Sequence, residues 1–166
     1  NMRYSLLVCN SNEDYMLENM HIKGLAEKHV DGIIYISGQN EIKKMNEIKN
    51  LPIVYIDRAP KNAEVLILSD NETGGYLAGR ELIQKGCRRI LFLRDIRFAS
   101  TVRSRKEGFV RALQEKGMAF NEELEMSCFP EYAEARVVME RLLKEKGCFF
   151  DGIFATNDMM ALACVN

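Results

Sequence analysis

The sequence predicts an α/β fold in which helices cover both faces of parallel sheets. Short apolar runs rich in Ile, Leu, Val, Phe and Tyr alternate with longer segments whose apolar residues recur at helical spacing. The short runs are nearly continuous, as expected of strands that are covered on both faces. A strand followed by a helix, repeated along the chain, indicates a doubly wound sheet with right-handed crossovers.

Seven runs are predicted to form strands. Each has the length of an ordinary strand and ends in polar or turn-forming residues. The runs are residues 4–9, 32–37, 52–57, 65–70, 89–94, 124–129 and 152–156.

Four longer segments are predicted to form amphipathic helices. With their apolar stripes in parentheses, they are residues 16–30 (Met16, Met20, Leu25), 72–86 (Leu77, Leu82, Ile83), 104–117 (Phe109, Val110, Leu113) and 133–147 (Val138, Met139, Leu142, Leu143). Gly86, Gly117 and Gly147 stand where helices commonly end in a left-handed residue, so they are predicted C-terminal caps. Asp158 opens a further helical run and is predicted to be its N-cap.

A boundary between two parts of the chain is predicted at the stretch ILSDNETGG, residues 67–75. Here a strand runs into Ser69, and Glu72 follows three residues later, which is the spacing of a capping box. The glycines within residues 74–79 lack the G-x-G-x-x-G spacing of a dinucleotide-binding turn and lie inside the helical stretch. Close packing between helices is therefore the expected reason for them.

The composition argues against several classes of protein. Among 166 residues, 23 Lys and Arg balance 24 Asp and Glu, so this segment alone is not expected to bind nucleic acid. No apolar run approaches the roughly 20 residues of a membrane helix. Five cysteines occur without a C-x-x-C, which indicates a reducing cytosol, and His21 and His29 lack neighbouring metal ligands. Without a nucleophile elbow, a zinc-protease motif or a Walker A motif, neither catalysis nor a cofactor is predicted.

Polar residues at the ends of the predicted strands are the candidate ligand contacts, because α/β sheets bind ligands at the carboxyl ends of their strands. Asp57 ends one run, beside Arg58, and either satisfies a local turn or accepts hydrogen bonds from a ligand. Asn157 lies at a strand mouth, and its amide has both donors and an acceptor. Residues 94–105 are predicted to form a long, arginine-rich loop, which is either an exposed basic loop or a functional one.

Five stretches together resemble the effector-binding domain of the LacI family of bacterial transcription regulators. They are VDGIIYIS, LPIVYIDR, SDNETGGYLAGRELIQKGCRRILFL, STVRSRKEGFVRAL and FDGIFATNDMMALA. The pattern S-x-x-x-x-R-x-x-G-F at residues 100–109, combined with ATND at residues 155–158, is specific for that superfamily. The resemblance implies a periplasmic-binding-protein-like fold of type I. Its two lobes, each a doubly wound parallel sheet, would be residues 1–69 and 70–166, both incomplete.

The resemblance also implies a small-molecule effector, which is a sugar, a sugar phosphate or a nucleobase, held between the lobes. By position, Asp57 contacts it from the first lobe and five residues do so from the second. Those five are Ser100, Thr101, Arg105, Phe129 and Asn157. The guanidinium of Arg105 is expected to bind hydroxyls or a carboxylate, Phe129 to stack on a ring, and Asn157 to orient a polar edge.

The implied function is a ligand-sensing domain whose effector allosterically controls operator binding by a cytoplasmic homodimer. DNA is then contacted only through the family's N-terminal headpiece, which has no counterpart in this sequence. A periplasmic sugar-binding protein of a transport system shares the fold and is the alternative, and a small α/β enzyme is a third hypothesis. The family's first strand normally lies between the runs at residues 4–9 and 32–37, so this chain alone is expected to have a defective first lobe.

Overall fold

The computed structural model describes residues 4–12, 14–36, 51–57, 63–97 and 99–165. Three residues of the sequence predictions lie outside the described residues: Ser37 at a strand end, Arg58 beside Asp57, and Phe98 in the arginine-rich segment. The chain forms two compact units, Asn1–Leu68 and Ser69–Asn166. Ser69 thus opens the second unit, one residue before the boundary that the resemblance implies.

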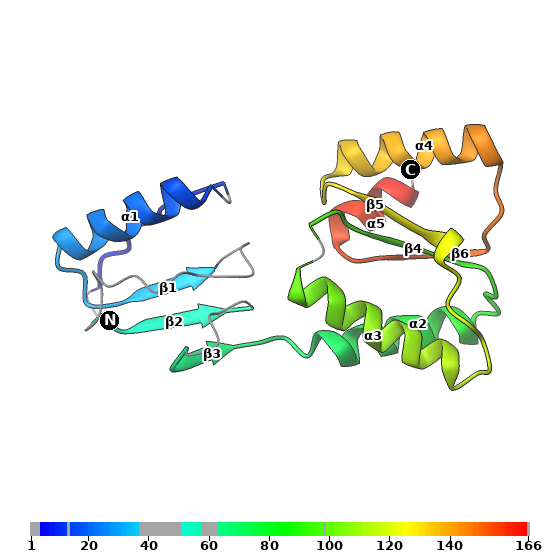
Figure 1. Ribbon diagram of the computed structural model, residues 1–166, viewed down its shortest axis with the longest axis horizontal. Helices are drawn as coiled ribbons and strands as arrows, with labels where there is room; N and C mark the ends of the chain where they lie inside the picture. The colour runs from blue at the N-terminus through cyan, green and yellow to red at the C-terminus, as the bar shows by residue number, and fades with distance from the viewer. Residues whose placement is uncertain (1–3, 13, 37–50, 58–62, 98, 166) are drawn as a thin grey trace. The chain divides into compact units, whose positions relative to one another are not determined.

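The described part of the first unit contains one helix and a parallel sheet (Figure 1). Helix α1 spans Tyr15–Glu27, and the strands β1 (Ile33–Ile36), β2 (Ile53–Ile56) and β3 (Val65–Ile67) pair in that order. The side chain of Asp14 accepts hydrogen bonds from the first backbone N–H groups of α1. This N-cap explains where the helix begins.

Two predictions for the first unit are wrong. Residues 4–9 form no strand, and their side chains are exposed. A run with strand propensity becomes a strand only where a neighbour supplies hydrogen-bond partners, and none of the described strands pairs with this run. On α1, Met16 and Met20 are exposed whereas Glu18 and Ile22 are buried. The buried residues of α1 therefore lie on the side of the helix away from Met16 and Met20.

The second unit is a three-layer α/β structure (Figure 1). Its described strands form a parallel sheet of order β5-β4-β6, composed of β4 (Ile90–Asp95), β5 (Glu125–Cys128) and β6 (Gly152–Ala155), with the short 3-10 turn Glu122–Leu124 leading into β5. Helices α2 (Asn71–Gln84) and α3 (Ser100–Gln114) cover one face. Helices α4 (Tyr132–Lys146) and α5 (Asp158–Val165) cover the other. The predicted doubly wound α/β fold is confirmed, as are six of the seven predicted strands.

Strand β4 lies at the centre of this unit and supplies both cores. Leu91 and Leu93 pack with residues of α4 and α5, whereas Ile90 and Phe92 pack with residues of α2 and α3. Successive side chains of a strand point to opposite faces, so one continuous apolar run fills two cores. The prediction of strands covered on both faces is therefore confirmed for β4.

The predicted glycines at the helix C-termini are left-handed, whereas the N-caps of α2 and α5 differ from the predictions. Gly86, Gly117 and Gly147 have φ of 95°, 68° and 67°, the left-handed region that glycine adopts without strain. The predicted capping box of Ser69 is wrong. Asp70 caps α2 instead, because Thr73 N donates to its carboxylate over 3.0 Å, and this hydrogen bond lowers the pKa of Asp70.

Helices α2 and α3 touch backbone to backbone at glycines. A Cβ on Gly75 would lie 2.0 Å from the carbonyl oxygen of Arg105, and one on Gly108 would lie 1.9 Å from that of Glu72. A Cβ on Gly79 would meet the ring of Phe109 at 2.8 Å. These distances leave no room for a side chain, so close helix packing accounts for all three glycines, as predicted for Gly75 and Gly79.

The cysteines differ in their expected reactivity. Cys9 and Cys148 are exposed, whereas Cys128 is buried beneath α4 and α5. Burial raises the pKa of the Cys128 thiol to about 11, so at pH 8 only roughly one such thiol in a thousand is the reactive thiolate. In native protein treated with iodoacetamide at pH 8, we expect peptide mass spectrometry to find Cys9 and Cys148 alkylated, and Cys128 only after denaturant is added. Equal alkylation rates for Cys128 and Cys148 in native protein would contradict this environment.

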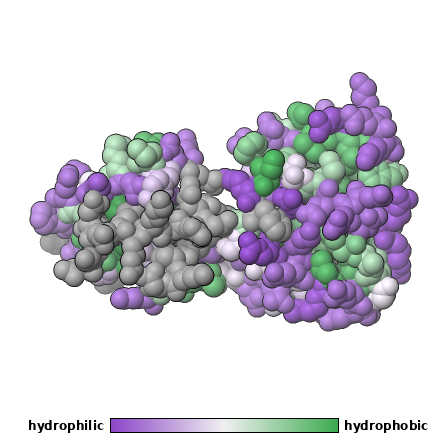
Figure 2. Space-filling model, viewed as in Figure 1, coloured by the Kyte–Doolittle hydropathy of each residue, from purple (hydrophilic) through white to green (hydrophobic). Residues whose placement is uncertain are grey.

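Hydrophilic residues make up most of the visible face of the second unit (Figure 2). Apolar side chains are nevertheless exposed on the outer faces of α4 and α5. They are Val137, Leu143, Met159, Leu162 and Val165. In the part of the chain that the structure describes, no helix has the length and apolarity that crossing a membrane requires.

Candidate functional site

The carboxyl ends of β4, β5 and β6 lie at one edge of the second unit's sheet, because the three strands are parallel (Figure 1). The register sets Asp95 opposite Cys128, and Leu93 opposite Ala155. The residues that follow the strands, including Phe129 and Asn157, therefore gather at this edge. We call it the strand-mouth edge.

The connection from β4 to α3 is short, so the predicted long loop over residues 94–105 is wrong. Strand β4 continues to Asp95, and α3 begins at Ser100. Ser100 is exposed, whereas Thr101 is 92% buried in the first turn of the helix. Both lie at the strand-mouth edge, but only Ser100 has a broadly accessible side chain.

Asp95 is a buried carboxylate that the sequence analysis did not single out. Its side chain is 8% exposed and accepts hydrogen bonds from Arg97, from Nε at 3.0 Å and from Nη2 at 2.7 Å. The backbone N–H of Asp95 donates to the hydroxyl of Thr156 over 3.3 Å, which links β4 to β6. A carboxylate at the end of a strand whose first four residues are apolar was the available signal. A buried carboxylate requires a partner of this kind.

Arg105 lies one turn inside α3, and two neutral groups hold its guanidinium. Its Nε donates to Oδ1 of Asn71 over 2.8 Å, and its Nη1 donates to the carbonyl oxygen of Thr156. These bonds occupy two of the five N–H donors of a guanidinium. Arg105 thus reaches the residue that follows β6, and part of its hydrogen-bonding capacity stabilises the protein itself.

Asn157, and not Asp158, is the N-cap of α5. Met160 N donates to Oδ1 of Asn157 over 2.8 Å, and the carbonyl oxygen of Asn157 accepts the first helical hydrogen bond, from Ala161 N at 3.0 Å. An Asn side chain caps as well as an Asp, and the residue that caps is the one that immediately precedes the helix. The other end of the same amide donates to the carbonyl oxygen of Pro130 over 3.3 Å. Asn157 therefore connects the mouths of β5 and β6.

Phe129 directly follows β5, and its side chain is 53% exposed. It is next to Pro130, the residue that Asn157 binds, so an accessible aromatic face lies among the polar groups of the strand-mouth edge. The structure thereby brings Arg105, Phe129 and Asn157 to one edge, with Ser100 and Thr101 at the start of α3.

Asp57 belongs to the first unit, where it follows β2. Its backbone N–H donates to the carbonyl oxygen of Ile67 over 2.9 Å, and its φ is 63°. Asp is among the few residues other than glycine that adopt this left-handed conformation readily. The backbone therefore changes direction sharply at Asp57, just after β2, and the side chain there is half-buried.

Away from the strand-mouth edge, Glu125 at the start of β5 joins two basic side chains. Its carboxylate accepts from Nε of Arg94 and from Nζ of Lys106, each over 2.6 Å. Burial alone would raise the pKa of Glu125, but the hydrogen bonds and charges of Lys106 and Arg94 outweigh it, and the pKa is lowered. Through Lys106, these ion pairs connect α3 to strands β4 and β5 of the sheet.

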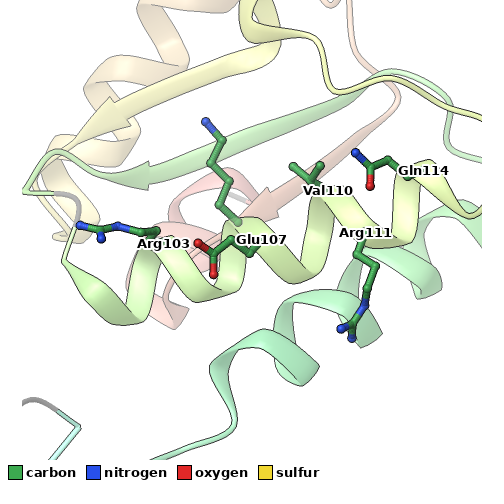
Figure 3. A pocket seen from close by; sticks show the side chains of 6 residues that line it. Arg103, Glu107, Val110, Arg111 and Gln114 are labelled. Carbon is green, nitrogen blue, oxygen red and sulfur yellow. The ribbon is translucent and has the colours of Figure 1, made fainter.

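An open hollow of about 380 Å³ lies along the outer face of α3 (Figure 3). Its lining residues are Arg103, Lys106, Glu107, Val110, Arg111 and Gln114. None of the predicted site residues lines it. Within the described residues, no group of three or more His, Cys, Asp or Glu side chains could hold a metal ion.

The chain matches known proteins along nearly its whole length. Residues 2–166 match the family model of periplasmic binding proteins and the sugar binding domain of the LacI family. The HTH-type transcriptional repressor PurR of Mannheimia succiniciproducens is 33% identical over 169 residues, which cover 98% of this chain and 50% of the repressor. The chain spans about half the length of the curated relatives that it matches.

Two solved structures show the same architecture. A transcription regulator of Staphylococcus saprophyticus superposes with a TM-score of 0.85 at 22% identity, over 98% of this chain and 61% of that one. The transcriptional regulator CelR in complex with cellobiose gives a TM-score of 0.75 at 28% identity, over 90% of this chain and 47% of that one. The family model and these similarities agree with the doubly wound fold and with the sequence patterns at residues 100–109 and 155–158. The chain belongs to the family of periplasmic binding proteins and LacI sugar-binding domains.

Proposed function

We propose that this chain is part of the ligand-sensing domain of a LacI-type transcription regulator. In the proposal, residues 1–69 and 70–166 belong to its two lobes, and a small-molecule effector binds at the strand-mouth edge of the second. The observation that carries the proposal is the exposed ring of Phe129 at the same strand-mouth edge as the polar groups of Arg105 and Asn157. An aromatic face next to hydrogen-bond donors is suited to a sugar or a nucleobase.

Each proposed contact has a distinct chemical role. Phe129 stacks on the apolar face of the effector's ring, and Arg105 donates its remaining N–H groups to hydroxyl or phosphate oxygens. Ser100 lies at the positive end of the α3 dipole, where Ala99 offers no side-chain cap, and this environment favours electron-rich oxygens. Thr101 and Asn157 shape the edge of the site, and Asp57 of the first unit accepts hydrogen bonds from effector hydroxyls.

The proposed mechanism is a binding switch in which no covalent bond changes. Effector binding favours one conformation of the regulator, and the affinity for operator DNA changes because the two conformations present DNA-binding segments differently. The similarity to a repressor supports the DNA partner, and the similarity to a cellobiose complex supports a sugar as one class to test. We place this switch in a cytoplasmic homodimer.

The test is a thermal-shift screen of the full-length protein against sugars, sugar phosphates and nucleobases. A ligand at one hundred times its Kd adds about 2.7 kcal/mol to the free energy of unfolding, so a binder gives a clear shift. We expect R105A to reduce the affinity about 10- to 100-fold, because charge-assisted hydrogen bonds contribute roughly 1.5–3 kcal/mol. R141A, at an exposed position on α4, is the matched control and should keep the wild-type shift.

The same ligand is then added to a gel-shift experiment with the full-length protein and its operator. A changed operator affinity supports the switch. A ligand-induced shift that survives in both R105A and F129A would move the binding site away from the strand-mouth edge and contradict the proposal.

A further inference from the structure

Asn71 has a buried amide side chain and is not among the predicted site residues. It is the first residue of α2 and is 9% exposed. Asp70, and not Asn71, caps this helix, so helix capping does not explain an amide here. A buried side-chain amide is stable only when its polar ends are hydrogen-bonded.

Both ends of the Asn71 amide are used. Oδ1 accepts from Nε of Arg105 over 2.8 Å, and Nδ2 donates to the carbonyl oxygen of Ser69 over 3.0 Å. The backbone N–H of Asn71 donates to the same carbonyl oxygen over 2.8 Å. The hydrogen bond to Ser69 therefore fixes the orientation of the amide independently of Arg105.

The glycine contacts between α2 and α3 explain how Asn71 reaches Arg105. Gly75 lies one turn after Asn71 on α2, and its Cα approaches the backbone of Arg105 so closely that a Cβ would lie 2.0 Å from the carbonyl oxygen of Arg105. Gly108 lies one turn after Arg105 on α3 and makes the reciprocal approach to Glu72. Only at this separation can a side chain as short as Asn bond the Nε of Arg105.

We infer that Asn71 is a positioning residue of the proposed effector site. Asn71 accepts from Nε and the carbonyl oxygen of Thr156 accepts from Nη1. The planar guanidinium is therefore anchored both by the first residue of α2 and by the residue that follows β6. A planar fork with two anchored donors has a fixed plane, so the directions of its remaining N–H groups are fixed as well. The effector then binds an arginine that is already oriented, and little side-chain entropy is lost on binding.

The inference rests on the proposed function for its link to the effector, but the anchoring itself can be tested without any ligand. The readout is the exchange of the Arg105 Nε–H proton with water, measured by NMR on deuterated full-length protein with ¹⁵N-labelled arginine. The resonance is assigned by its loss in R105K. We expect exchange to be at least about 10-fold faster in N71A, and N71D, which keeps an acceptor oxygen for Nε, to restore slow exchange.

Asp70→Ala is the matched control, because it removes the cap of the same helix end without removing an acceptor of Arg105. If D70A accelerates the exchange as much as N71A does, the helix end in general and not Asn71 orients the guanidinium, and the inference fails. Unchanged exchange in N71A also overturns it.

A second measurement links the anchoring to binding. For a compound that the screen identifies, we expect N71A to weaken the affinity about 10-fold and D70A to leave it within about 2-fold of wild type. Wild-type affinity in N71A together with fast Nε–H exchange would show that anchoring does not serve the effector. If no compound binds the wild type, the proposed function fails, while the exchange data still decide whether Asn71 orients Arg105.

Discussion

Replacement of Phe92 by alanine is expected to lower the free energy of unfolding by about 3–5 kcal/mol, as large-to-small changes of buried aromatic residues do. The side chain of Phe92 is fully buried in the central strand β4. Its ring stacks on Phe109 at a centroid distance of 5.4 Å and on Phe154 at 5.2 Å. The substitution removes a ring that three elements share, so no single neighbour can fill the space.

Phe129→Ala is the matched control for this prediction, because it removes the same atoms from a half-exposed position at the strand-mouth edge. We expect the free energy of unfolding to change by no more than about 0.5 kcal/mol. The measurement is urea-induced unfolding of the full-length protein, followed by circular dichroism. Equal urea midpoints for F92A and F129A would show that Phe92 is not the centre of this core.

Gly75→Ala is expected to lower the free energy of unfolding by about 1–3 kcal/mol or more, as overpacking of a filled contact does. The new Cβ would lie 2.0 Å from the carbonyl oxygen of Arg105 and 2.7 Å from the carbonyl carbon. These are backbone atoms, so the clash cannot be relieved by a change of side-chain rotamer. Helices α2 and α3 must move apart, which also separates Asn71 from Arg105.

The adjacent Gly74 provides the control within the same helix. A Cβ at Gly74 would meet nothing within 4 Å, and the position is exposed. Because alanine is a better helix former than glycine by roughly 0.5–1 kcal/mol, G74A should raise stability by up to that amount. Opposite signs for two neighbouring Gly-to-Ala changes, measured by urea unfolding, would establish the close helix contact. A stabilised G75A would contradict it.

The predicted site residues at the strand-mouth edge also have structural roles. Asn157 caps α5 and binds the carbonyl oxygen of Pro130, and Arg105 bonds both α2 and the end of β6. Substitution of either residue therefore changes stability as well as any ligand affinity. This is why the ligand-induced shift, and not the melting temperature alone, is the quantity to compare among variants.

Several features were predictable from the sequence because they depend on local interactions. The apolar runs that became β1 to β6, the periodic segments that became α2 to α4, and the left-handed glycines all follow from backbone preferences and side-chain spacing. The packing role of Gly75 and Gly79 was also predicted, although the same prediction for Gly74 is wrong, because a Cβ there would meet nothing within 4 Å. The family patterns at residues 100–109 and 155–158 include residues that lie at the strand-mouth edge.

Other features were decided by contacts between residues distant in sequence. Residues 4–9 have the composition of a strand, but no described strand lies beside them to complete the hydrogen bonds. The anchoring of Arg105 requires Asn71, 34 positions away, and Thr156, 51 positions away. The backbone N–H of Asp95 likewise bonds the hydroxyl of Thr156, 61 positions away.

The sequence by itself thus determined the order of strands and helices, the ends of the helices that stop at glycine, and the family to which the chain belongs. Only the tertiary structure decided that Asn157 binds the carbonyl oxygen of Pro130, that Asn71 and Thr156 hold Arg105, and that Phe129 remains exposed. The physical reason is range. Propensity and periodicity act over a few residues, whereas a hydrogen-bond partner or a buried face is supplied by segments that meet only when the chain has folded.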